Sequence, residues 1–205
     1  MTATLRDSSF TELHKALEPI LGFDRPWLVA GGWAIDLYLG RSTRPHKDVD
    51  IAIFRQDQLR LQGYLEGWGL YIAESGKLQR WQPGEYIELP LHGIWAYAPG
   101  REPERLVDPT IEDYPDLEFL FNERSETDWL FRKDLSIKRA LTVALMQRNG
   151  IPFLAPEIVL LYKSSGMRAT DIDDFLLTKE AMSEEQLAWL RKAIERGGSQ
   201  HPWLA

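Results

Sequence analysis

Apolar residues recur along the chain at two spacings, and these spacings predict the secondary structure. Leu13, Leu17 and Ile20 share one helical face, which predicts a first helix. Residues 27–30 form a short apolar run between turn signals, as expected for a buried strand. Residues 33–39 return to helical spacing. The first 40 residues therefore predict a helix, a strand and a second helix.

Residues 48–54 alternate acidic and apolar side chains, the period of two that is typical of a strand with one face in the core. We expect a helix over 56–68 after it. From 70 to 99, short β-prone runs alternate with turn signals. Residues 101–115, with three prolines and many charges, are predicted to form a surface loop.

The rest of the chain moves from strands to helices. Three β-prone runs predict strands at 117–122, 129–132 and 137–147. Pro156 stands where proline is favoured in a first helical turn, so a helix is expected to begin there. Further helices are predicted over 171–179 and 183–196, the second with a capping box between Ser183 and Gln186. Together these elements predict an α+β fold whose C-terminal segment, 156–205, is helical.

Composition narrows the class of protein. The 205 residues are 44% hydrophobic and 27% charged, as in a globular domain. No apolar run approaches the ~18–20 residues that span a bilayer, and residues 1–10 lack the features of a signal peptide. Without cysteine there are no disulfides, thiolate zinc sites or cysteine nucleophiles. We therefore expect a cytoplasmic protein with no membrane association.

The net charge of −7 bears on the partner. Phosphate contacts dominate the affinity of proteins for nucleic acid and require a basic surface. The acidic balance therefore disfavours nucleic acid as a partner and favours a small cationic molecule in an acidic cleft.

Two short motifs are typical of a site for phosphate and metal. Gly31 and Gly32 open the predicted helix after the first strand, where residues without side chains let backbone amides approach an anion. Asp48 and Asp50 lie two residues apart on a strand and so point the same way. Carboxylates so placed can share divalent metal such as Mg²⁺, which prefers oxygen ligands. The order of glycine pair, helix, basic turn and acidic strand predicts transfer chemistry on a triphosphate.

Residues 31–36, Gly-Gly-Trp-Ala-Ile-Asp, and residues 39–50, which end in Thr-Arg-Pro-His-Lys-Asp-Val-Asp, resemble the signature of aminoglycoside and lincosamide nucleotidyltransferases. These enzymes belong to the polymerase-β-like nucleotidyltransferase superfamily, and the match is specific over 27–54. The resemblance implies a minimal nucleotidyltransferase core with a mixed sheet at 1–155, with the helices of 156–205 packed on or beside the active site. It also implies a nucleoside triphosphate donor, ATP before the others, and two Mg²⁺ ions.

The resemblance assigns roles to this motif. By it, Asp48 and Asp50 are metal ligands, and Gly31 and Gly32 cradle the phosphates. Arg44 either reaches the β- and γ-phosphates or pairs with an acid on the surface. In the same stretch, His46 is expected to hydrogen-bond a neighbouring carboxylate, since Mg²⁺ disfavours imidazole, and Asp36 to face away from the metals.

The family carries a third acid on a later strand, which often serves as general base and as a metal ligand. Glu118 is the first candidate, because it lies in the middle of the predicted strand with apolar neighbours on the opposite face. Glu88 and Asp116 are the alternatives.

Two further sets of residues are candidates for binding. Lys163 resembles a lysine that many superfamily members place against the triphosphate, although a lysine whose stem packs on apolar surface is the alternative. We expect the nearby acids of 171–174 to be structural. Four aromatic residues fall where an acceptor pocket is expected: Trp81, Trp95, Tyr97 and Trp129.

The leading hypothesis is a Mg²⁺-dependent nucleotidyltransferase of the adenylyltransferase type. It moves a nucleoside monophosphate to a hydroxyl of an aminoglycoside-like or lincosamide-like small molecule. A toxin-like or regulatory enzyme that acts on tRNA or protein is the second hypothesis. A non-catalytic nucleotide-binding protein is the third, and loss of one of the paired acids would be its mark.

Overall fold

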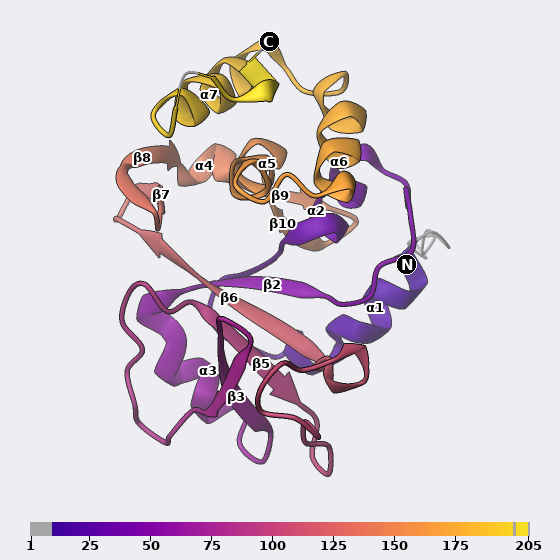
Figure 1. Ribbon diagram of the computed structural model, residues 1–205, viewed down its shortest axis with the longest axis vertical. Helices are drawn as coiled ribbons and strands as arrows, with labels where there is room; N and C mark the ends of the chain where they lie inside the picture. The colour runs from indigo at the N-terminus through magenta and orange to yellow at the C-terminus, as the bar shows by residue number, and fades with distance from the viewer. Residues whose placement is uncertain (1–9, 199, 205) are drawn as a thin grey trace, which may run out of the picture.

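The computed structural model describes residues 10–198 and 200–204, and residues 1–9, including nearly all of the segment tested for a signal peptide, lie outside them. Ten strands form a mixed sheet in the order β4-β3-β5-β6-β2-β1-β10-β9, and the hairpin of β7 and β8 extends from β6 (Figure 1). The strands are β1 (Trp27–Val29), β2 (Asp50–Phe54), β3 (Gly69–Glu74), β4 (Lys77–Arg80), β5 (Gly93–Tyr97), β6 (Leu117–Arg124), β7 (Asp128–Phe131), β8 (Asp134–Ala140), β9 (Leu145–Arg148) and β10 (Ile151–Leu154).

Two strand pairs are parallel, β2 with β6 and β1 with β10, and the remaining pairs are antiparallel. β2 lies between β1 and β6, in the middle of the sheet. Its residues Ile51, Ala52 and Ile53 are fully buried. The sequence predicted a strand with one face in the core, whereas beyond Asp50 both faces are covered, because a central strand in a mixed sheet has layers on each side. The mixed sheet confirms the predicted α+β fold.

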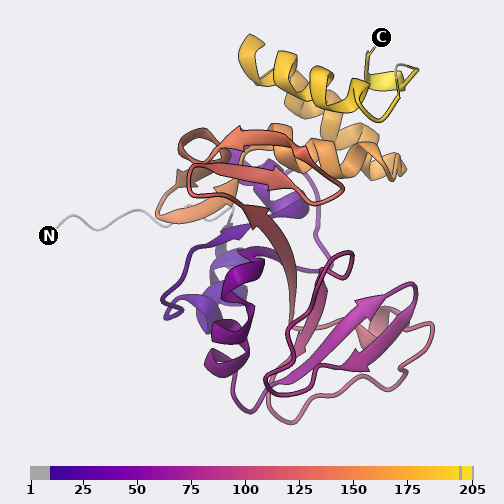
Figure 2. The same cartoon turned by 90° about the vertical axis from the view of Figure 1, so that its left-hand side faces the viewer.

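The C-terminal helices lie far from helix α3. The C-terminal helices lie together at the end of the molecule beyond β9 and β10, whereas α3 and strands β3–β5 lie at the other end (Figures 1 and 2). The α-helices are α1 (Thr11–Leu17), α2 (Gly31–Leu39), α3 (Gln58–Tyr64), α4 (Leu141–Ala144), α5 (Pro156–Ser164), α6 (Ala169–Lys179) and α7 (Glu184–Glu195). None in the described part of the chain is long and apolar enough to cross a bilayer.

Several local predictions are confirmed. Helix α5 begins at Pro156, and α7 carries the predicted capping box, in which the Ser183 side chain accepts a hydrogen bond from the Gln186 amide. The loop over 101–115 is irregular apart from the short 3₁₀ segment Ile111–Asp113. Its polar backbone is held by Asp113, whose carboxylate accepts hydrogen bonds from the amides of Glu104, Arg105 and Thr110.

One predicted strand is wrong. Residues 137–147 were expected to be continuous, but β8 ends at Ala140, the short helix α4 follows, and β9 begins at Leu145. The chain changes partner there: β8 pairs with β7, whereas β9 pairs with β10. The Ala155 amide donates to the Ala144 carbonyl and closes the corner. Local β propensity does not record a change of strand partner, because that is set by tertiary packing.

Candidate active site

The glycine pair forms the junction between β1 and α2. Gly31 has a φ of 57°, in the left-handed region that favours glycine. A Cβ on Gly31 would lie 1.8 Å from Oδ2 of Asp50, and one on Gly32 would lie 2.5 Å from Nη2 of Arg44. The Ala30 amide donates to the Asp50 carbonyl at 2.8 Å and fixes the junction to β2. The absence of two side chains therefore lets an acid and a cation reach the first turn of α2.

The three candidate acids lie on two neighbouring parallel strands. Asp50 is the first residue of β2 and pairs in register with Glu118 of β6. Asp48 lies just before β2 rather than inside a strand, and is partly exposed. Register partners on adjacent strands present their side chains on the same face. The structure therefore brings Glu118 beside Asp50, with Asp48 two residues ahead.

The alternatives for the third acid lie elsewhere. Glu88 is exposed in the irregular segment between β4 and β5. Asp116 precedes β6, and its carboxylate accepts hydrogen bonds from the Ala98 amide at 2.8 Å and from Arg101 at 2.5 Å. Asp116 therefore has a structural role at the start of β6, and Glu88 belongs to no strand of the sheet.

Glu118 and Asp50 both have raised pKa values. Burial raises the pKa of Glu118 to about 8, with the charges of Asp50 and Asp48 adding to it, against a hydrogen bond from Trp95. Burial, followed by the charge of Asp48, raises the pKa of Asp50 to about 6. Carboxylates that are crowded and partly desolvated hold protons unless a cation compensates them.

The donor set suits a hard divalent cation. Within residues 10–198 and 200–204, none of Asp48, Asp50 and Glu118 has an ion pair with a basic side chain. These side chains are adjacent without converging into a closed cluster of three ligands in the described part of the chain. Uncompensated carboxylate oxygens are the ligands that Mg²⁺ prefers, usually together with substrate phosphate and water. The residues present therefore fit the group that the sequence implied.

A set of cations lies beside the glycine turn. Lys163, near the end of α5, is 9% exposed and contacts Asp171 at 3.0 Å and Asp174 at 2.9 Å. Arg44 pairs with the same Asp174 at 3.3 Å, and Arg168 pairs with Asp171 at 2.9 Å. The two buried acids of α6 are structural, as expected. Lys163 is anchored by both and also lines the pocket next to Asp50.

The basic linker between α2 and β2 is fixed by a buried acid. Asp36 is fully buried in α2 and accepts hydrogen bonds from the amide and hydroxyl of Thr43 at 3.1 and 2.5 Å. Nε2 of His46 lies 2.7 Å from Asp36, and the His46 ring lies 4.2 Å from that of Trp33. The structure thus confirms that His46 hydrogen-bonds a neighbouring carboxylate.

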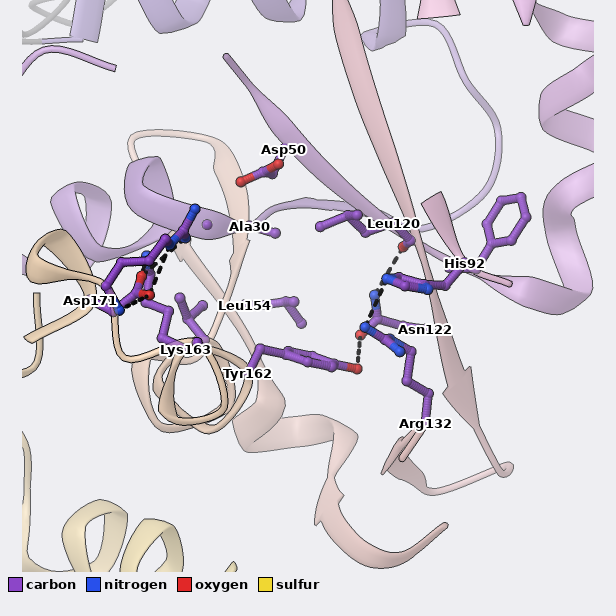
Figure 3. A pocket seen from close by; sticks show the side chains of 15 residues that line it. Ala30, Asp50, His92, Leu120, Asn122, Arg132, Leu154, Tyr162, Lys163 and Asp171 are labelled. Carbon is purple, nitrogen blue, oxygen red and sulfur yellow. Dashed lines mark hydrogen bonds and ion pairs between the residues drawn. The ribbon is translucent and has the colours of Figure 1, made fainter. Parts of the chain in front are cut away.

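A pocket of about 240 Å³ opens beside Gly31 and Asp50 (Figure 3). Arg168 and Lys163 line it. Tyr162 lies between Lys163 and a second polar group (Figure 3). That group consists of His92, Asn122 and Arg132, which come from three different segments of the chain. No sequence pattern predicts this group, because no short spacing links its members and each residue type is common on surfaces.

The prediction that four aromatic residues line an acceptor pocket is mostly wrong. Trp81, Tyr97 and Trp129 are buried, with exposed fractions of 3%, 0% and 0%, and serve as core residues. Trp95 alone of the four is partly exposed, and it packs on Tyr114 with ring centroids 5.6 Å apart. Large aromatic residues on strands bury most of their area between layers, which a strand pattern cannot distinguish from the wall of an open pocket.

Two curated enzymes resemble part of this chain. The curated 2''-aminoglycoside nucleotidyltransferases of Escherichia coli and Klebsiella pneumoniae are each 36% identical over 65 residues. That alignment covers 32% of this chain and 37% of the length of each relative, so the chain matches little more than a third of those proteins.

Solved structures match over more of the fold. The solution structure of ANT(2'')-Ia, described as an antibiotic-resistance factor, superposes with a TM-score of 0.56 at 18% identity, over 90% of each chain. The lincomycin-bound crystal structure of the lincosamide antibiotic adenylyltransferase LnuA has a TM-score of 0.53 at 18% identity, over 83% of this chain and 96% of LnuA. At such identities these likenesses establish the shared fold.

A family model described as aminoglycoside-2''-adenylyltransferase matches residues 12–175, which include the glycine turn, the three acids and Lys163. Because that match extends over most of the sequence, the protein belongs to the aminoglycoside-2''-adenylyltransferase family.

Proposed function

We propose that this protein is a Mg²⁺-dependent nucleotidyltransferase that moves a nucleoside monophosphate from a nucleoside triphosphate to a hydroxyl of a small antibiotic-like acceptor. ATP is the donor that the family description implies. The acceptors in two related structures are of this kind: ANT(2")-Ia was solved in complex with adenylyl-2"-tobramycin, and LnuA with lincomycin.

The observation that carries the proposal is the pairing of Asp50 with Glu118 directly beside Gly31. Carboxylates, a glycine turn at a helix N-terminus and a buried lysine come from four separate elements. Each has an ordinary structural explanation alone. Gly31, Asp50 and Lys163 line one pocket, and Glu118 is the register partner of Asp50. This arrangement supports a triphosphate site with metal.

On the donor side, the chain offers backbone amides and cations. The amides of Gly31 and Gly32 belong to the first turn of α2, where the helix dipole favours an anion. Lys163, Arg168 and Arg44 lie around this turn and would share their charge between Asp171, Asp174 and the phosphates. Lys163, already held in place by two acids, has little rotamer entropy to lose on binding.

On the acceptor side, Glu118 is the proposed general base. Mg²⁺ held by Asp48, Asp50 and Glu118, as two ions in our proposal, would neutralise the phosphates and stabilise the charge that develops on them. Glu118 takes the proton of the acceptor hydroxyl. The hydroxyl oxygen of the acceptor then bonds to the α-phosphorus, while the bond between the α-phosphorus and pyrophosphate breaks.

Charge supports a small, cationic acceptor over nucleic acid. The net charge is −7, and the acids of the site lie at its centre. A negative cleft attracts amine-bearing molecules and repels polyanions. We also propose a cytoplasmic location, where triphosphates and Mg²⁺ are present. In this proposal the helices of 156–205 pack on or beside the active site of the core, 1–155.

The test is to incubate the protein with Mg²⁺, ATP and either tobramycin or lincomycin, and to measure pyrophosphate release and the mass of the acceptor. We expect an acceptor heavier by one nucleotidyl group, and no product from Asp50→Asn. Asp173→Asn, a change at an exposed acid of α6, is the matched control and should retain activity. Transfer of labelled nucleotide to tRNA or protein instead would contradict the proposal, as would nucleotide binding without any transfer across an acceptor panel.

A further inference from the structure

The pocket beside Asp50 has a second polar end, which we call the arginine end: His92, Asn122 and Arg132. Arg132 follows β7, and its guanidinium lies 5.2 Å from the centre of the Tyr162 ring. Its Nη2 lies 2.8 Å from Nε2 of His92. Among residues 10–198 and 200–204, no carboxylate forms an ion pair with Arg132, although the side chain is only partly exposed. The acid whose charge acts on Arg132 is Glu123, which is already paired with Arg55 at 2.6 Å. A half-buried cation without a direct ion pair therefore faces this pocket.

His92 does not supply the missing charge. Arginine has donors only, so Nε2 of His92 accepts from Arg132, and Nδ1 carries the proton that it donates to the Pro90 carbonyl at 3.2 Å. Burial, together with the charge of Arg132, lowers the pKa of His92 to about 4. His92 is thus a neutral acceptor that orients the guanidinium.

The other acceptors at this end are also occupied. Oδ1 of Asn122 accepts from the Trp129 indole at 2.8 Å and from the Tyr162 hydroxyl at 3.4 Å. The Tyr162 oxygen in turn accepts from Arg132. Nδ2 of Asn122 donates to the Leu120 carbonyl at 3.0 Å, which leaves its second N–H. The hydrogen-bonding capacity left at the arginine end therefore consists of donors from Arg132 and Asn122.

The rest of the pocket suits a flat heterocycle. Leu120, Leu154 and the ring of Tyr162 form an apolar wall between the arginine end and Asp50 (Figure 3). Val159 also lines the pocket. The volume of about 240 Å³ is below the ~300–1,000 Å³ of sites for drug-sized ligands. A cationic, multi-ring acceptor is disfavoured there by size and by the charge of Arg132.

We propose that the arginine end binds the base of the nucleotide donor and prefers a 6-oxopurine such as guanine over adenine. The proposal rests on the proposed function, since it assumes a triphosphate between Gly31 and Lys163. A guanine edge presents two acceptors, O6 and N7, which match the paired N–H groups of an arginine. Adenine presents an amino donor at the same place, which would face other donors and leave them unpaired. ATP still binds through its phosphates and the apolar wall, but more weakly.

Binding of non-reacting α,β-methylene triphosphates, measured by calorimetry with Mg²⁺, tests this ranking. We expect the guanosine and inosine analogues to bind about tenfold more tightly than the adenosine analogue, as expected for one good bidentate contact. Inosine lacks the 2-amino group, so equal binding of inosine and guanosine assigns the preference to O6. A 7-deaza guanosine analogue should lose most of the advantage.

Two variants connect the ranking to the residue. Arg132→Gln should bring the three analogues to similar affinity, and Arg132→Lys should retain part of the preference, because lysine keeps the charge without the paired geometry. Arg105→Gln, at an exposed arginine of the 101–115 loop, is the matched control and should keep the full ranking. Tripolyphosphate, which has no base, should bind all four proteins alike and shows that the variants are folded.

The outcomes separate this inference from the proposed function. Adenosine binding as tightly as guanosine, or a ranking that survives Arg132→Gln, overturns the base preference and leaves nucleotidyl transfer standing. Failure of every triphosphate and of tripolyphosphate to bind the wild-type protein overturns both.

Discussion

Asp50 and Glu118 are direct register partners on the parallel strands β2 and β6. Asp50 lies at the start of β2, against the glycine turn, and Glu118 is the second residue of β6. Two acids far apart in the sequence therefore share one face of the sheet within reach of the first turn of α2. The predicted chemistry depends on this relationship.

Removal of the carboxylate of Glu118 should abolish proton transfer. Glu118→Gln is expected to lower kcat by roughly 10²–10⁴-fold, the usual contribution of a general base, with a smaller effect on KM for the donor. The matched control is Glu126→Gln, at an exposed acid in the turn between β6 and β7. Steady-state pyrophosphate release measures both, and a Glu118→Gln enzyme with wild-type kcat excludes Glu118 as the base.

Thermal stability without divalent cations should fall as the pH rises. In the folded protein the pKa of Asp50 is raised from 3.8 to about 6, and that of Glu118 from 4.5 to about 8. A carboxyl group with a raised pKa in the folded state stabilises the folded protein at pH values below its unfolded-state pKa. This stabilisation is lost as the pH rises through about 6 for Asp50 and about 8 for Glu118. Scanning calorimetry between these values should show a decreasing Tm.

A variant and added Mg²⁺ test whether this pH dependence arises from Asp50 and Glu118. Glu118→Gln should flatten the upper part of the pH dependence, and Mg²⁺ should raise the Tm most at high pH, where the acids are ionised. A wild-type Tm that is flat across this range, or that Mg²⁺ raises more at low pH, contradicts it.

Gly31→Ala should damage the site beyond its cost to the backbone. The new Cβ would overlap Oδ2 of Asp50, and Gly31 already has a φ of 57°. Gly67→Ala is the matched control: Gly67 also has a positive φ, 87°, but nothing lies within 4 Å of its Cβ position. Both variants should lose ~1–2 kcal/mol of stability from the left-handed conformation. Only Gly31→Ala should also lose activity, by at least tenfold, and equal activity in the two variants would count against the role of the turn.

Asp174→Asn tests how the cations near the glycine turn are held. Asp174 is buried and pairs with both Lys163 and Arg44, so the change leaves Arg44 without its ion pair and Lys163 with Asp171 alone, at a cost of ~2–4 kcal/mol. Asp173→Asn, on the exposed side of the same helix, should change stability by less than ~0.5 kcal/mol. Because a triphosphate replaces the missing negative charge, ATP should raise the Tm of Asp174→Asn more than that of the wild type. Equal shifts in Tm would mean that Lys163 and Arg44 do not face the phosphates.

Much of the site was predictable where function depends on neighbours in the sequence. The hydrogen bond from His46 to Asp36 joins residues ten positions apart and was implied by the family resemblance rather than by spacing. The glycine pair and the acids at 48 and 50 follow from spacing within short segments of the chain. The same holds for the start of α5 at Pro156 and for the Ser183 capping box. These features are local, so propensity and periodicity record them directly.

The assignment of Glu118 shows where local patterns stop. Glu88, Asp116 and Glu118 all lie in β-prone segments, and the sequence could only rank them. The parallel pairing of β2 with β6 separates them, because it places Glu118 next to Asp50 and leaves Asp116 to hold Arg101 at the start of β6. Strand register is a long-range property, fixed by which hydrophobic faces pack together.

The sequence by itself determined the chemistry of the donor half: the glycine turn, the paired acids and the mixed sheet that carries them. Only the tertiary structure decided which third acid joins Asp50, which of the aromatic residues are core, and that His92, Asn122 and Arg132 meet in one pocket. The physical reason is distance along the chain. Residues one turn or two strand positions apart are placed by local geometry, whereas residues on different strands are placed by the packing of the whole sheet and its helices.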